Sequence, residues 1–125
     1  MLILEDQDYC NMDMCMELDA LGCPIPKHDT INLYTKERNT VYGKFSLYEA
    51  QKWLRKKKGL HITIFSSSQQ SWMFRITKPH QKLEDGVYGE DFYTYEDSLS
   101  AGINECIKLL KKYELESNDI VSDTN

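Results

Sequence analysis

The residues of this chain that could most readily do chemistry are its cysteines and histidines. Cys10, Cys15, Cys23 and His28 lie close together in the sequence, and clustered thiolates and imidazoles are the ligands that zinc prefers. The gaps between them match no zinc knuckle or ribbon, and no two cysteines show the two-residue spacing of such sites. We therefore expect free, buried thiols, with no metal and no cofactor.

Catalytic motifs are also missing. A thiol and an imidazole could meet in the fold as nucleophile and base, but none of His28, His61 and His80 stands beside an evident nucleophile. The acidic pairs at 90–91 and 96–97 are explained by a strand end and a helix N-terminus. No glycine-rich phosphate loop or metalloprotease motif is present. We expect a protein that is not an enzyme.

The charged residues are strongly segregated along the chain. Residues 1–29 carry seven acidic and one basic side chain, residues 30–82 two acidic and eleven basic, and residues 83–125 eleven acidic and three basic. Either these opposite segments pair within the fold, or they face different partners.

The densest basic run, Arg55–Lys58, is followed by Gly59. Cations in the last turn and a glycine after it are typical of a helix C-terminus, which accounts for the run structurally. The alternative is a patch for nucleic acid or an acidic partner beside Trp72 and His80. Its members would be Arg55, Lys56, Lys57, Lys58, Arg75, Lys78 and Lys82.

The elements that position these residues begin with a helix. Asp8 or Asn11 can cap it, it runs to about Leu21, and Gly22 ends it. Methionine packs adaptably in cores and in promiscuous interfaces. We expect an ordinary core role for this helix, with an interface as the alternative, formed by Met12, Met14 and Met16.

A hairpin and a second helix follow. Thr30–Tyr34 and Thr40–Phe45 are rich in β-branched and aromatic residues and are joined by a polar stretch at 35–39. Ser46 and Glu49 have the spacing of a capping box, which predicts a helix over Leu47–Lys58.

Three strands and a last helix complete the pattern. The strands are expected at Leu60–Phe65, Trp72–Thr77 and Val87–Tyr93, with Gly89 marking a bulge or a close approach. Thr94 and Asp97 can cap a helix that runs from Tyr95 to about Tyr113, whose apolar face comprises Leu99, Ile103, Cys106, Ile107 and Leu110.

The fold class is therefore α+β, in the order helix, hairpin, helix, three-stranded antiparallel meander, helix. The length of 125 residues suits one domain, which we place at 1–113, with a mobile acidic tail at 114–125.

The order of elements over residues 46–113 resembles that of a double-stranded-RNA-binding domain. In that family, lysines at the start of the final helix contact phosphates. Here the matching stretch, Tyr95–Leu99, is acidic. A shared order of elements without the contact residues does not carry the function.

Three further segments resemble small proteins of unknown function encoded in Bacteroidetes genomes and their phages. They are Met14–Cys23, Ser46–Arg55 and Tyr93–Ile103, and the resemblance extends over about residues 9–113. It implies a bacterial or phage-infected cytoplasm, and it implies no activity, cofactor or catalytic residue. The stretch Tyr93–Leu110 also resembles the end of HicB-like antitoxins.

No stretch approaches the roughly 18 apolar residues of a membrane-spanning helix, and the N-terminus lacks the features of a signal peptide. We therefore expect a cytoplasmic protein without membrane contact. The leading hypothesis is a small non-catalytic accessory or protein-interaction module of a bacterial or mobile-element genome, which works through a protein partner or as a homodimer. The alternative is a nucleic-acid-binding protein that uses the basic segment 55–82.

Overall fold

The computed structural model describes residues 4–66, 71–78 and 87–123 of the chain. Its fold is α+β, as the sequence predicts, with a two-stranded hairpin and a three-stranded antiparallel meander packed against a C-terminal helix. After a short 3-10 turn, the elements are α1 (Met12–Ala20), β1 (Lys27–Ile31), β2 (Arg38–Tyr42), α2 (Leu47–Trp53), the π-helical turn η2 (Leu54–Lys58), β3 (His61–Ser66), β4 (Trp72–Thr77), β5 (Val87–Phe92) and α3 (Tyr95–Asp123).

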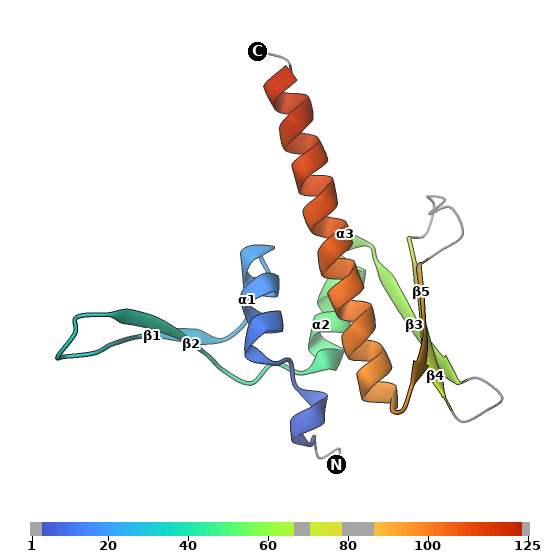
Figure 1. The fold of residues 1–125 in the computed structure, drawn as a ribbon, viewed down its shortest axis with the longest axis horizontal. Coiled ribbons are helices and arrows are strands. Elements are labelled where there is room, and N and C mark those ends of the chain that lie inside the picture. Colours follow the sequence, from blue (N-terminus) through green and yellow to red (C-terminus); the bar gives the residue numbers. More distant parts are fainter. Residues whose placement is uncertain (1–3, 67–70, 79–86, 124–125) are drawn as a thin grey trace.

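The meander forms a twisted sheet with α3 lying across one of its faces (Figure 1). Alternate residues of β3 and β4 face the helix, and Ile62, Phe74 and Ile76 are buried there. From α3, Leu99 and Ile103 are completely buried and belong to the same core. This core confirms the three predicted strands and the apolar face of the last helix.

Gly89 confirms the predicted irregularity in β5. A Cβ atom at this position would lie 2.0 Å from Cε1 of Phe74, so the ring occupies the space that any other residue would need. The pairing of β4 with β5 shifts register between Trp72 and Phe74, and Asp91 takes a left-handed backbone conformation with φ of 67°. The bulge allows Phe92 to contact Phe74 at 5.9 Å between ring centroids.

The predicted caps set the ends of α1 and α2. The Asn11 side chain accepts a hydrogen bond from the Met14 amide at 2.8 Å. Ser46 and Glu49 form the reciprocal capping box, each side chain accepting from the other residue's amide at 3.0 Å. Past the helix ends, Gly22 and Gly59 take positive φ, which glycine adopts without a steric cost.

The hairpin lies about three residues earlier in the chain than the sequence predicts, and it forms its own sheet rather than joining the meander. The reason is local turn chemistry at Asn32. Its side chain accepts from the amides of Tyr34 and Thr35, so the chain turns where β-branched and aromatic residues suggested a strand. Lys36 completes the turn with φ of 63°. The hairpin projects from the body as an arm (Figure 1).

The last helix is longer than predicted. It continues without interruption to Asp123 instead of ending near Tyr113, because no glycine or proline follows Tyr113 to stop it. Its C-terminal end extends beyond the rest of the molecule in Figure 1. The mobility of residues 114–125 stays a prediction. Within the described ranges, no helix is both long enough and apolar enough to cross a bilayer.

Candidate functional site

The four cysteines are free thiols, as the sequence predicts, and their surroundings keep them protonated. Burial raises the pKa of Cys10 to about 12, and it raises the pKa of Cys23 to about 11 and of Cys106 to about 12. Cys10 and Cys15 instead donate weakly to backbone carbonyl oxygens, of Ser46 and Cys10 respectively. Protonated thiols are poor nucleophiles and poor metal ligands.

Histidine positions do not change this picture. His28 lies exposed on β1, His61 begins β3, and His80 falls outside the described residues. Across the described parts of the chain, no three His, Cys, Asp or Glu residues come close enough to hold a metal ion.

The candidate basic residues are distributed over two elements. Arg55–Lys58 form the π-helical turn after α2, where Lys58 Nζ lies 5.5 Å from the Trp53 ring centroid. Arg75 lies in the middle of β4, on the face that α3 does not cover, opposite Thr63. Lys78, at the end of β4, approaches the Gly59 backbone and lies 5.9 Å from the Tyr113 ring. Lys82 falls outside the described residues.

The three candidate interface methionines divide into two environments. Met14 is 2% exposed and belongs to the core, so it contributes to no surface of the folded chain. Met12 and Met16, one helical turn apart, are 61% and 51% exposed. The structure thus leaves two flexible apolar side chains uncovered on one face of α1.

A groove runs between these two methionines and the hairpin. It is lined by Met12, Met16 and every residue of β2, but by no residue of β1, and its volume is about 390 Å³. The groove continues into a second hollow of about 210 Å³, which is also lined by Met12 and by Thr40–Tyr42 of β2. This hollow extends to Cys10 and Cys15 at the base of the arm. Because only β2 contributes from the hairpin, the groove follows the outer edge of this strand.

The backbone of β2 presents unpaired hydrogen-bonding groups to this groove. At the two ends of the hairpin, the Gly43 amide donates to the Pro26 carbonyl and the Asn32 amide donates to the Glu37 carbonyl. These two bonds show which residue pairs of the antiparallel ladder are hydrogen-bonded and which are not. By that alternation the N–H and C=O groups of Arg38, Thr40 and Tyr42 point away from β1. Over the described part of the chain, no strand pairs with them.

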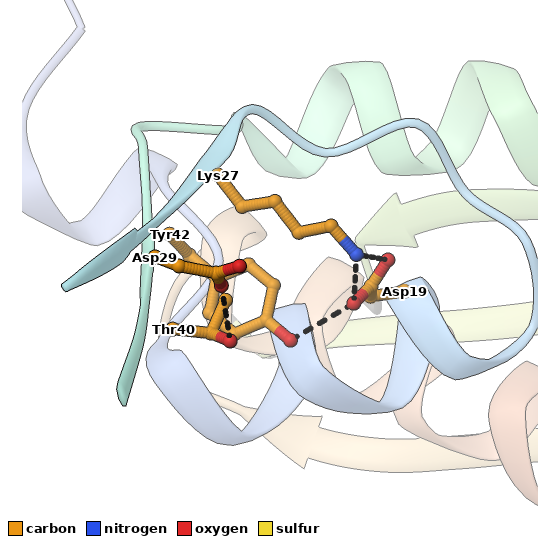
Figure 2. A network of polar contacts seen from close by, with 5 residues as sticks. All are labelled: Asp19, Lys27, Asp29, Thr40 and Tyr42. Atoms are coloured by element: carbon orange, nitrogen blue, oxygen red, sulfur yellow. Dashed lines mark hydrogen bonds and ion pairs between the residues drawn. The ribbon is translucent and has the colours of Figure 1, made fainter. Parts of the chain in front are cut away.

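The base of the arm is held against α1 by Asp19. Its carboxylate accepts hydrogen bonds from Lys27 Nζ at 2.8 Å and from the Tyr42 hydroxyl at 3.0 Å (Figure 2). The hydrogen bond from Lys27, and then that from Tyr42, lowers the pKa of Asp19. The hydrogen bond to Asp19 in turn raises the pKa of Lys27. Farther along the arm, the Thr40 hydroxyl donates to Asp29 at 3.1 Å. One face of the hairpin is thereby fixed beside Met12 and Met16.

Sequence reasoning identified the methionines but missed the edge of β2. Both faces of the hairpin are polar, so no apolar alternation marked its register, and the strand edge has no signature in side-chain types. The arm also exposes two large residues of its turn, Leu33 at 77% and Tyr34 at 97%.

No protein-family model, curated protein or solved structure matches this chain. The resemblance to small Bacteroidetes and phage proteins therefore stays a prediction.

Proposed function

We propose that this protein is a small non-catalytic interaction module whose working surface is the open edge of β2, and that this edge joins the same edge of a second copy. The observation that carries the proposal is the groove in which unpaired backbone groups of β2 face exposed Met12 and Met16. An isolated two-stranded hairpin is marginal in water, and open strand edges are templates for pairing.

The sequence of β2 suits antiparallel pairing with itself about Thr40. In that register Thr40 faces Thr40 of the second copy, Arg38 faces Tyr42, and Asn39 faces Val41. No like charges oppose each other, and Arg38 can lie over the ring of Tyr42. The same pairing centred on β1 would place Asp29 against Asp29, which is unfavourable.

The backbone N–H and C=O groups of β2 that point away from β1 are the ones that this antiparallel register would pair between the two copies. Arg38, Thr40 and Tyr42 are the residues whose N–H and C=O point out of the hairpin, and pairing them across a two-fold axis forms about six hydrogen bonds. The pairing keeps equivalent faces together. Met12 and Met16 of both copies therefore lie on one face of a four-stranded sheet and lose contact with water.

The experiment is sedimentation velocity of the full chain and two proline variants. Thr40→Pro removes the outward N–H of β2 and leaves the bonds to β1 intact, since proline is tolerated where the amide faces solvent. Asp29→Pro is the matched control, because Asp29 pairs directly with Thr40 across the hairpin. Each substitution removes one outward N–H and the same side-chain hydrogen bond.

We expect a reversible dimer for the wild type and for Asp29→Pro, and a monomer for Thr40→Pro. Concentrations of about 10 to 500 μM cover interfaces worth about 5 to 7 kcal/mol. Circular dichroism confirms that both variants fold. A wild type that stays monomeric throughout, or a Thr40→Pro variant that dimerises as the wild type does, would refute the proposal.

A further inference from the structure

A second hollow lies beside α2, on a part of the surface unrelated to the β2 groove. Its volume is about 230 Å³, and its surface is almost entirely apolar. The apolar lining comes from Pro24, Phe45 and Trp53, which belong to three separate parts of the chain. Phe45 is largely buried and Trp53 half-buried, so the hollow reaches only part of each ring, beside the exposed Pro24. A partly exposed aromatic surface of this kind favours a flat apolar group.

The rim of this hollow is strongly basic. Lys52, Lys56 and Lys57 line it, and within the described residues none of the three makes an ion pair. The hollow's acidic residue is Glu49, whose carboxylate is already engaged by the Ser46 amide in the capping box. Three ammonium groups close to an apolar surface repel each other, and a bound anion relieves that repulsion.

The turn that carries these lysines has an unusual geometry. From Leu54 to Lys58 the helix is π-helical, and the Gly59 amide closes it by bonding to the Leu54 carbonyl. π-helical turns are rare in proteins, and those that occur are often found at functional sites. The negative end of the helix dipole explains why cations lie in the last turn, but it does not explain why they surround an apolar hollow.

We infer that the hollow beside α2 is a binding site for a small organic anion with a flat apolar body, such as an aromatic carboxylate. The apolar body lies on Phe45 and Trp53, and the anionic group faces Lys52, Lys56 and Lys57. Charge and apolar contact are both needed, because each alone is weak at an exposed site.

The chain offers a built-in reporter for this site. Its two tryptophans are Trp53 in the hollow and Trp72 on β4, where the ring packs against Tyr95 at 5.4 Å. Titration with 2-naphthoate is followed through the two indole N–H signals in ¹H–¹⁵N correlation spectra. Neutral 2-naphthamide and inorganic phosphate serve as probes that carry only the apolar body or only the charge.

We expect 2-naphthoate to shift the Trp53 signal and leave the Trp72 signal in place, with each partial probe binding at least tenfold more weakly. The double variant Lys56→Ala and Lys57→Ala should weaken naphthoate binding about tenfold, which corresponds to about 1.4 kcal/mol. Arg55→Ala is the matched control, because Arg55 belongs to the same basic run and does not line the hollow. It should change the affinity less than twofold.

Three results would overturn the inference. Equal binding of naphthoate and naphthamide would remove the role of the lysines, and equal shifts of Trp53 and Trp72 would show binding without a site. A single-stranded oligonucleotide that binds more tightly than naphthoate and depends equally on Arg55 would make the basic run, rather than the hollow, the binding unit. Thr40→Pro serves as a separate check, since its response to naphthoate should equal that of the wild type.

Discussion

At the scale of single residues, the thiols are the clearest case of chemistry suppressed by burial. Cys10 and Cys106 have pKa values raised to about 12, so almost no thiolate exists at pH 8. We expect native protein to react with iodoacetamide at least about a hundredfold more slowly than an unperturbed cysteine, whose pKa is about 8.5. Mass spectrometry of timed samples measures this. Rapid labelling of Cys10, Cys23 or Cys106 at pH 8 would contradict the assignment of inert thiols.

Gly89 is the residue whose replacement should damage the sheet most specifically. A Cβ at this position would lie 2.0 Å from the ring of Phe74, so Gly89→Ala forces the core to shift, at a cost of about 3 kcal/mol. Gly22→Ala is the control, because Gly22 has positive φ but no neighbouring atom within 4 Å, and backbone strain alone costs about 1 to 2 kcal/mol.

Thermal unfolding of the two glycine variants separates packing from backbone strain. We expect the melting temperature of Gly89→Ala to fall by about 10 °C, and that of Gly22→Ala to fall by clearly less. If the two variants lost the same stability, the close approach of β5 to Phe74 would be wrong.

At the scale of elements, the position of the arm depends on Asp19 being ionised. Its folded-state pKa lies below the unfolded value of about 3.9, because Lys27 and Tyr42 donate to the carboxylate. The anchor therefore contributes stability above about pH 4 and loses it as the pH falls through the lowered folded value. We expect arm amides to gain mobility below about pH 3, before global unfolding, measured by ¹⁵N relaxation.

The Asp19→Asn variant should show the loosened arm already at neutral pH. Asp29→Asn is the control, since the hydrogen bond of Asp29 joins it to Thr40 within the arm. An arm equally rigid at pH 6 and pH 2.5, or unaffected by Asp19→Asn, would refute the anchoring role.

The sequence predicts best those elements whose ends are set by residues close to them in the chain. Ser46, Glu49 and Gly59 set the start and the end of the helical segment 47–58 through caps that operate within a few residues, and these predictions are confirmed. The π-helical geometry of its last turn was not predicted. The predicted bounds of the hairpin strands are wrong by about three residues because the side chain of Asn32, rather than strand propensity, sets the turn. The predicted end of the last helix near Tyr113 is wrong because an acidic, polar composition alone does not end a helix, and no glycine or proline follows to do so.

The candidate sites were predictable only in part, for a different physical reason. Met12 and Met16 could be named as interface candidates from residue type, but their exposure and the burial of Met14 depend on how α1 packs. The groove needs β2 beside α1, and the hollow needs Pro24 and Phe45 beside Trp53. These are contacts between segments that no sequence spacing connects.

At the scale of the whole molecule, the body and the arm have different roles. α1, α2, α3 and the meander enclose the core, whereas the hairpin contributes little to it and extends into solvent (Figure 1). Two of the three ion pairs in the described residues, Lys27 with Asp19 and Lys111 with Glu17, hold α1 to its neighbours, and the third joins Lys108 to Glu105 within α3. None of them involves the exposed lysines beside α2. A compact core with a projecting two-stranded arm is a shape suited to joining another chain.

The most direct test of this account is amide hydrogen exchange within β2 at low and high protein concentration. The amides of Asn39 and Val41 bond β1 and should be equally protected at both concentrations, whereas that of Thr40 faces the groove. We predict that protection of the Thr40 amide rises with concentration, about two- to fivefold between about 10 and 500 μM, and that it tracks dimer formation. Fast exchange of the Thr40 amide at every concentration would contradict the pairing of β2 with a second copy.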